Sequence, residues 1–205
     1  MNVNVGCGRS PTPGWRNYDN SLTLRLARWP VIVGLLRRLG LLDDAQAGFA
    51  RATVATDVEW ADATALPLPD TSADTVYSSH MLEHLSRVEA ERFLVEARRI
   101  LKPGGVLRVA VPDVRRAAER YLADGEADAF VARLHMVADA PRSVLAWLRL
   151  MIVGPRQHQW MYDGKSLVRL LERFGFESVT VVAAGTTRIE SPGGLNLRER
   201  EEESV

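Results

Sequence analysis

The N-terminal residues combine a glycine-rich turn with a carboxylate at a spacing that suits a nucleotide. Residues 2–5 alternate polar and apolar side chains, so they predict a short strand that runs into the turn. The turn consists of Gly6, Cys7 and Gly8. Two glycines let the backbone turn sharply and let a ligand approach without meeting a Cβ. Asp19 ends a second expected strand, where a carboxylate can accept both hydroxyls of a ribose or can simply initiate a turn.

A second carboxylate follows the next expected strand, which lies within 54–60. Asp62 stands directly before Ala63, and a carboxylate there could accept a hydrogen bond from an adenine amino group. The alternative is an aspartate that only caps a turn. Each of these signals is weak alone. The glycine turn, Asp19 and Asp62 strengthen one another, because all three follow expected strands.

His80 follows a strand expected over 74–79, and its type suits a general base. An imidazole with a pKa near neutrality can take a proton from a hydroxyl or an amine. His80 and His84, with Glu83 between them, could instead hold a metal ion. We favour a packed or hydrogen-bonded His84, and we therefore assign no metal to the site.

The elements that must position these residues alternate between strands and helices. Apolar residues at helical spacing predict a helix over 87–101, and residues 106–111 are the most apolar candidate strand. Two further strands are expected over 177–183 and 195–201. Strands that alternate with helices favour a doubly wound α/β fold, a mostly parallel sheet with helices on both faces. In such a sheet the ligand binds beyond the carboxyl ends of the strands, where the polar residues above stand.

Two segments interrupt this alternation. Residues 21–50 interleave leucines with arginines, and residues 125–160 are partly helical. We expect both to be helical insertions that act as a lid or a dimer face, which we favour over a membrane contact because arginine stems often cover apolar surface. The second insertion ends in a polar, aromatic stretch where a substrate would dock. Its candidate substrate contacts are His158 and Tyr162.

Composition excludes several classes of protein. The chain has 205 residues, 46% hydrophobic and 25% charged, which suits a single soluble domain over 1–205. Lys plus Arg and Asp plus Glu are both 26, so the zero net charge argues against a long nucleic acid as partner. The single cysteine allows no internal disulfide. We see no signal peptide or membrane-spanning run and expect a cytoplasmic protein, and the preference for arginine over lysine favours a bacterial source.

Three stretches of the sequence resemble a known family. They are VNVGCGRSPTPGWRNYDNS, VEWADATALPLPDTSADTVYSSHMLEHL and RRILKPGGVLRVAVPD. They are similar to successive motifs of class I S-adenosylmethionine-dependent methyltransferases. The nearest subset is a small bacterial group with a GCG-x-GW-x-N-x-D start, whose genes often lie near polysaccharide or natural-product genes. The resemblance covers about 2–20, 54–112 and, more loosely, 156–185.

This resemblance implies a seven-stranded Rossmann-like sheet and S-adenosylmethionine as the cofactor. The glycine turn would cradle the methionine part of the cofactor, Asp19 would bind the ribose, and Asp62 with Ala63 would bind adenine. The residues lining the pocket near the sulfonium would be Ser78, Ser79 and His80. The two insertions would supply the cover over the site.

The resemblance also implies the reaction. The acceptor would be a small molecule or a saccharide-containing metabolite, methylated at oxygen or nitrogen. A non-catalytic cofactor-binding or partner-binding protein of the same fold is the main alternative, because a fold does not guarantee an activity. An NAD-dependent enzyme is disfavoured, because a pyrophosphate needs a full glycine motif at a helix N-terminus. We expect the chain to act alone or as a homodimer.

Overall fold

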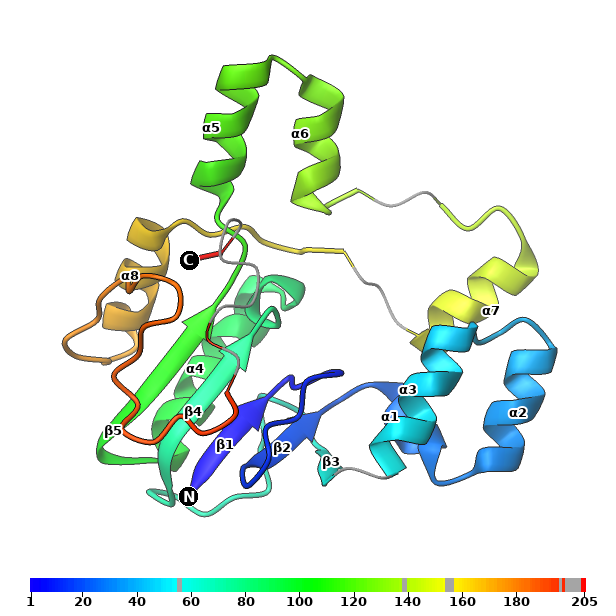
Figure 1. The fold of residues 1–205 in the computed structure, drawn as a ribbon, viewed down its shortest axis with the longest axis horizontal. Coiled ribbons are helices and arrows are strands. Elements are labelled where there is room, and N and C mark those ends of the chain that lie inside the picture. The colour runs from blue at the N-terminus through cyan, green and yellow to red at the C-terminus, as the bar shows by residue number, and fades with distance from the viewer. Residues whose placement is uncertain (55–56, 138–139, 154–156, 196, 198–203) are drawn as a thin grey trace.

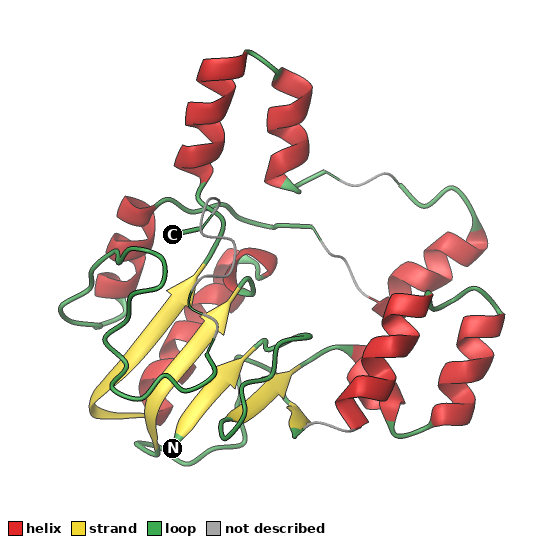
Figure 2. Cartoon of the chain, in the orientation of Figure 1, coloured by secondary structure: helices red, strands yellow, loops and turns green. Residues whose placement is uncertain are grey.

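The computed structural model describes residues 1–54, 57–137, 140–153, 157–195, 197 and 204–205. At its centre lies a five-stranded sheet in the order β3-β2-β1-β4-β5, and every neighbouring pair of strands is parallel (Figure 1, Figure 2). The strands are β1 (Asn2–Val5), β2 (Arg16–Asp19), β3 (Val58–Trp60), β4 (Ala73–Ser79) and β5 (Leu101–Ala110). The predicted α/β class with a parallel sheet is confirmed. The expected seven strands are wrong for the described residues.

The two absent strands are those expected near the C-terminus. Residues 177–183 form no strand, although their β-branched composition favours one. A strand also needs a neighbouring segment to pair with, and the backbone that follows β5 is already hydrogen-bonded to another segment. The Val111 N–H donates to the Val205 carbonyl at 2.9 Å, and the Val205 N–H donates back to Val111 at 2.8 Å. The strand expected over 195–201 lies largely outside the described residues.

Helices lie between the strands in the chain or follow the last strand. They are α1 (Leu22–Ala27), α2 (Pro30–Arg38), α3 (Asp44–Val54), α4 (Arg87–Ile100), α5 (Val114–Asp124), α6 (Ala127–Leu134), α7 (Val144–Val153) and α8 (Gly164–Arg173), with a short 3₁₀ helix η1 (Leu82–His84) after β4. Side-chain caps define where several of them begin. Ser86 and Glu89 form a capping box at α4, and Asp163 with Ser166 forms another at α8. These caps fix the two helices that pack on the sheet.

The two faces of the sheet are covered differently. In Figure 1 α4 lies behind the sheet, and α8 joins the same core, which buries Val3 and Val5 of the central strand. No described helix covers the opposite face. There the segment toward the C-terminus crosses β4 and β5, and Ile189 and Leu195 pack with Tyr77 (Figure 2). The prediction of helices on both faces is therefore wrong for the described part of the chain.

The connection between β1 and β2 explains why no helix forms on that face. Pro11 and Pro13 stand two residues apart and prevent a helix of normal length. Buried asparagines hold the connection as a loop instead. The Asn17 side chain accepts from the Thr12 N–H at 2.7 Å and donates to the Thr12 carbonyl at 3.0 Å. Asn4 donates to the Thr12 hydroxyl at 3.2 Å, so the loop lies flat against the strands.

The first expected insertion forms α1, α2 and α3, and α7 of the second insertion packs with them at one end of the molecule, whereas α6 packs against α5 (Figure 1). α1, α2 and α3 enclose a small core, and α1 also contacts α7. This core consists of Ala27, Val33, Leu42, Ala47 and Ala50. The first insertion was expected over 21–50 but extends further, because Asp43 accepts from the Gln46 N–H at 2.7 Å and so begins α3, which runs to Val54.

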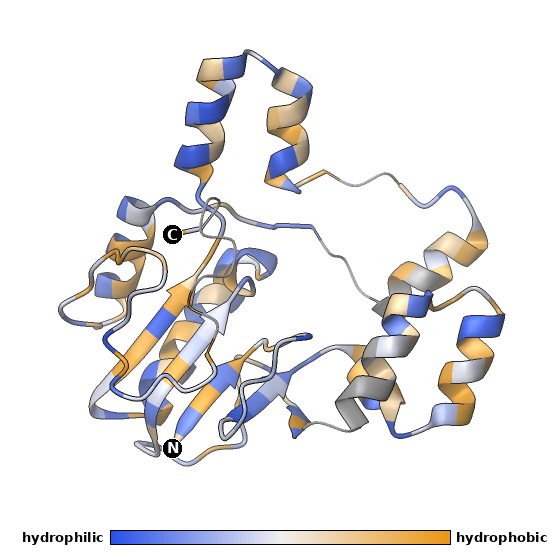
Figure 3. Cartoon of the chain, viewed as in Figure 1, coloured by the Kyte–Doolittle hydropathy of each residue, from blue (hydrophilic) through white to orange (hydrophobic). Residues whose placement is uncertain are grey.

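Apolar side chains remain exposed on this helical group. Trp29 and Val31 at the start of α2 are 58% and 83% exposed, and Trp147 of α7 is 50% exposed. Figure 3 shows α7 largely in the hydrophobic colour. Among the described residues, no helix combines the length and the apolar character needed to cross a membrane.

Candidate functional site

The register of the parallel strands brings their carboxyl ends to one edge of the sheet. Val5 pairs with Tyr18, Asp19 with Trp60, and Ser79 with Ala110. The loops after β1, β2, β3 and β4 therefore open on the same side. This is the edge where ligands bind in open α/β sheets.

The glycine turn after β1 is held against β2 by backbone hydrogen bonds. The N–H groups of Gly6 and Cys7 both donate to the Tyr18 carbonyl, at 2.8 and 3.1 Å. Gly6 and Gly8 have φ angles of +70° and +50°, so both positions favour glycine. A Cβ on Gly6 would lie 2.7 Å from the Cβ of Met81 and closer still to its Cγ, whereas a Cβ on Gly8 would meet no heavy atom within 4 Å. The open space therefore lies beside Gly8.

Asp19 fastens the same turn. Its Oδ2 accepts from the Gly8 N–H at 3.0 Å, and its Oδ1 accepts from the Ser21 N–H at 2.8 Å. Both roles expected for Asp19, binding of ribose hydroxyls and initiation of a turn, thus have a physical basis. The carboxylate organises two turns, and because each carboxylate oxygen has two lone pairs, it retains acceptor capacity for two ligand hydroxyls.

Cys7 lies inside the glycine turn and is 6% exposed. Burial raises the pKa of its thiol to about 12, and the nearby charge of Asp19 adds to the shift. The side chain is therefore a protonated thiol at neutral pH. It can line a site, but it is not a nucleophile.

Asp62 and Ala63 follow β3 next to this turn. Asp62 Oδ1 accepts from both the N–H and the hydroxyl of Thr64, at 2.8 and 2.9 Å. The aspartate therefore caps a turn, which is one of the two roles expected for it. The adjacent Ala61 N–H donates to the Asp19 carbonyl at 3.2 Å. The end of β3 is thereby fixed beside Asp19, and Ala63 is buried there.

Ser78 and Ser79 end β4. Their hydroxyls are buried and have no hydrogen-bond partner among the described residues. A buried hydroxyl without a partner is destabilising, because it has lost its hydration. Because successive strand residues point to opposite faces of the sheet, the two unpartnered hydroxyls lie on opposite faces at the carboxyl edge.

His80 follows β4 in the left-handed backbone region, with φ of +52°. Both ring nitrogens have partners. Nδ1 lies 3.3 Å from Glu83 Oε1, and Nε2 lies 3.1 Å from the Ser204 hydroxyl. Glu83 is fully buried. The tautomer in which Nδ1–H donates to the Glu83 carboxylate is the one that leaves a lone pair on Nε2.

A cavity of about 70 Å³ opens beside His80. Its wall comes from the end of β4, from α5 and α6, and from the segment before α8. Its polar lining residues are His80, Asp113, Arg116, Arg120, Arg133, His135 and His158. The sequence did not single out the three arginines. The four-residue spacing of Arg116 and Arg120 places them on one face of α5, which is a signal that could have found them.

The structure separates the two predicted substrate contacts. His158 lines the cavity, and its ring centroid lies 5.0 Å from that of His84 and 5.4 Å from that of His135. Burial lowers the pKa of His158, so its imidazole is neutral at neutral pH. Tyr162 lies in the main hydrophobic core and is not among the cavity-lining residues. Burial raises the pKa of its phenol.

Known proteins resemble this chain over part of its length. Residues 21–109 match a family described as a methyltransferase domain. A protein of Encephalitozoon cuniculi that carries the name of a methyltransferase is 34% identical over 117 residues, which span 55% of this chain and 53% of that protein. A protein of Mycolicibacterium smegmatis, named as a probable S-adenosylmethionine-dependent methyltransferase, is 36% identical over 113 residues, or 54% of this chain and 37% of the relative.

Solved structures include a Thermotoga maritima protein described as a possible histamine N-methyltransferase. It has a TM-score of 0.49 and 20% identity, with 86% of this chain and 64% of that one covered. The chain spans about half or less of the length of the two curated relatives. The domain match and the names of these relatives agree with the methyltransferase resemblance noted in the sequence. The glycine turn and Asp19 lie just before the matched residues.

Proposed function

We propose that this chain is an S-adenosylmethionine-dependent methyltransferase of the small bacterial group, and that it methylates an oxygen or nitrogen of a small molecule or a saccharide-containing metabolite. The observation that carries the proposal is the meeting of the glycine turn, the Asp19 carboxylate and the unpartnered Ser78 and Ser79 hydroxyls at one edge of a parallel sheet. The methyltransferase domain match supports the same conclusion.

The residues at this edge fit the cofactor in chemistry and in space. The open side of Gly8 leaves room for the methionine part to approach the backbone. Asp19 retains lone pairs for the ribose hydroxyls, and the buried end of β3 at Ala63 offers an apolar surface for adenine. Asp62 would accept from the adenine amino group with the carboxylate oxygen that Thr64 leaves free. The bound cofactor would supply an activated methyl group on its sulfonium.

His80 is the residue best placed to act as a base. Glu83 orients the ring and holds the proton on Nδ1, so Nε2 is the atom that would take the proton of an acceptor hydroxyl or amine. The Ser204 hydroxyl now fills the position on Nε2 that an acceptor hydroxyl would take. The methyl group would pass to the acceptor heteroatom as its proton passes to His80.

We propose that the reacting end of the acceptor enters the cavity next to His80, since a volume of about 70 Å³ admits only a few atoms. His158 lies in its wall and would contact the acceptor, whereas Tyr162 would act only through the packing of the core. Arginines bind carboxylates and phosphates well, but two of these arginines already have acidic neighbours: Arg116 lies 3.8 Å from Asp113, which also lines the cavity, and Arg133 lies 3.3 Å from Asp124. The wall therefore does not select the charge of the acceptor.

The helical group of α1, α2, α3 and α7 would serve as a lid or as the face of a homodimer. Its exposed tryptophans and its separate small core support a unit that can move relative to the sheet. The chain would act in the cytoplasm as one domain, with no long nucleic acid as partner.

Two experiments test the proposal. Calorimetry of the pure chain should show binding of S-adenosylmethionine at one site and no binding of NAD. A panel of hydroxyl and amine acceptors with a methyl-labelled cofactor should then show label transfer to at least one of them. Binding without transfer to any acceptor would favour the non-catalytic alternative, and failure to bind the cofactor would overturn the proposal.

A further inference from the structure

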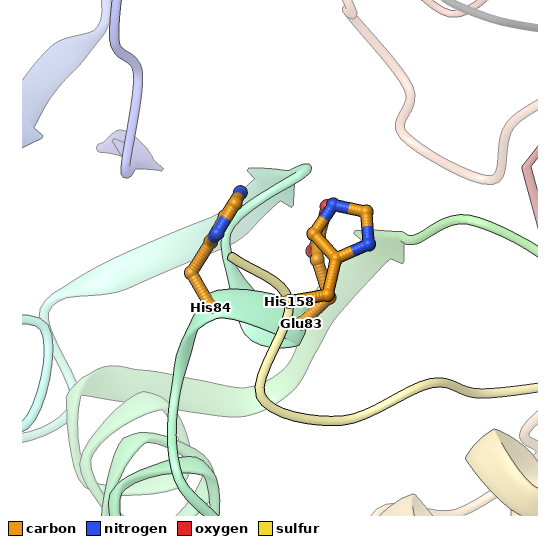
Figure 4. A group of neighbouring side chains, drawn as sticks. All are labelled: Glu83, His84 and His158. Atoms are coloured by element: carbon orange, nitrogen blue, oxygen red, sulfur yellow. The ribbon is translucent and has the colours of Figure 1, made fainter. Parts of the chain in front are cut away.

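Three side chains from two distant segments meet beside the candidate site. Glu83 and His84 belong to η1, and His158 belongs to the segment before α8 (Figure 4). One ligand atom from each lies within 4.8 Å of the other two. Backbone contacts hold the two segments together, because the N–H of Gln159 donates to the Glu83 carbonyl at 2.7 Å and the Gln159 side chain donates to the His84 carbonyl at 2.8 Å.

Each of the three side chains has an unused ligand atom. Glu83 is fully buried; its Oε1 faces His80, but its Oε2 has no hydrogen-bond partner among the described residues. His84 Nδ1 lies 3.2 Å from the Gln157 carbonyl, which can only accept, so Nε2 keeps the lone pair. His158 is 6% exposed, and its Nδ1 also has no described partner.

Without a bound cation, this group of unpartnered polar atoms is unfavourable for the stability of the fold. A buried carboxylate oxygen with no partner has lost its hydration and gained nothing in return. A histidine whose other nitrogen donates to a backbone carbonyl is the usual arrangement of a metal ligand. Two imidazoles and one carboxylate suit zinc and similar divalent ions, whereas calcium and magnesium prefer oxygen ligands.

We propose that Glu83, His84 and His158 bind one divalent transition-metal ion of the zinc class. This set differs from the His80–His84 pair that the sequence allowed, because His80 is engaged by Glu83 and Ser204, and His158 takes its place. Three protein ligands leave a coordination position for water or for a substrate oxygen. His158 also lines the cavity, so the ion would sit at the wall of the acceptor site; only this last role rests on the proposed function.

Zinc titration of the chain without a histidine tag tests the site. After dialysis against a chelator, calorimetry with zinc chloride should show one ion per chain. The His84→Gln and His158→Gln variants should each lower the zinc affinity more than about 100-fold, because loss of an outer-shell partner already lowers it about 10- to 100-fold. His135→Gln is the matched control: its ring lies near His158, yet it does not belong to the three, and zinc affinity should be unchanged.

X-ray absorption at the zinc edge keeps the test decisive if a variant fails to fold. The native chain should show nitrogen and oxygen neighbours at about 2.0–2.2 Å, with imidazole scattering and no sulfur. No stoichiometric binding, a zinc shell without imidazole, or full affinity in a folded His84→Gln/His158→Gln variant would overturn the proposal. Titration of the same samples with S-adenosylmethionine separates failure of the metal site from failure of the proposed function.

Discussion

Alanine at Gly6 should mainly lower stability, whereas alanine at Gly8 should lower stability less and should mainly weaken cofactor binding. Both glycines have positive φ, so alanine at either position costs about 1–2 kcal/mol from the left-handed backbone alone. Gly6 packs against Met81, and forcing a methyl group into that contact adds about 1–3 kcal/mol. The new Cβ at Gly8 meets nothing in the protein and projects into the space assigned to the cofactor.

Thermal unfolding and calorimetry measure the two effects. For a chain of this size about 1 kcal/mol corresponds to a shift of about 2–4 °C, so Gly8→Ala should lower Tm by about 2–8 °C and Gly6→Ala by clearly more. Gly8→Ala should weaken S-adenosylmethionine binding at least tenfold, about 1.4 kcal/mol. Gly14→Ala is the control, because Gly14 has φ of +78° and open space but lies before β2, away from the carboxyl edge.

The reasoning would be refuted by either of two results. Equal Tm losses for Gly6→Ala and Gly8→Ala would show that the Met81 side chain moves aside without a cost in stability. Unchanged cofactor affinity in Gly8→Ala, with Gly14→Ala as reference, would show that the open space beside Gly8 is not part of the cofactor site.

Four further outcomes follow from the site. Asp19→Ala should weaken S-adenosylmethionine binding about tenfold to 150-fold, corresponding to about 1.5–3 kcal/mol of charge-assisted hydrogen bonds, and unchanged calorimetric affinity would remove Asp19 from the site. His80→Gln should lower turnover about 10²–10⁴-fold at nearly constant cofactor affinity, whereas full activity would reduce His80 to a lining residue. With its thiol pKa raised to about 12, Cys7 should resist iodoacetamide at pH 8 in the native chain and react once the chain is unfolded in urea, as followed by mass spectrometry; rapid native labelling would contradict its burial. Hydrogen exchange over 21–50 should slow when cofactor or acceptor binds, and strong protection in the free chain that no ligand changes would rule out a lid.

Local patterns predicted the part of the fold in which short-range signals decide. The strand entering the glycine turn, the apolar strand over 106–111 and the helix over 87–101 were all expected, and the structure contains β1, β5 and α4 there, although β5 already begins at Leu101. Each depends on alternation or helical spacing within one segment. The strand expected over 177–183 failed because pairing depends on distant residues, and Val205 occupies the backbone after β5.

The candidate site also contains features that the sequence could predict and features that it could not. The residues after β1, β2 and β4 could be predicted to share an edge, because parallel strands place their carboxyl ends together. That Glu83 orients His80 was not foreseen, since the positive φ of His80 is what turns its ring back toward η1. The approach of His158 to Glu83 could not be predicted, because it depends on the packing of residues 157–160 beside η1, which are distant in sequence.

The contact between α1 and α7 has a consequence for the order in which the chain folds. α1, α2 and α3 are neighbours in sequence, so their small core closes short loops and can form early. α1 ends at Ala27 and α7 begins at Val144, and the chain between them contains β3, β4 and β5. Closing so long a loop is entropically unfavourable until the sheet has brought its ends together. We therefore expect α7 to dock last in refolding and to detach first under a protease.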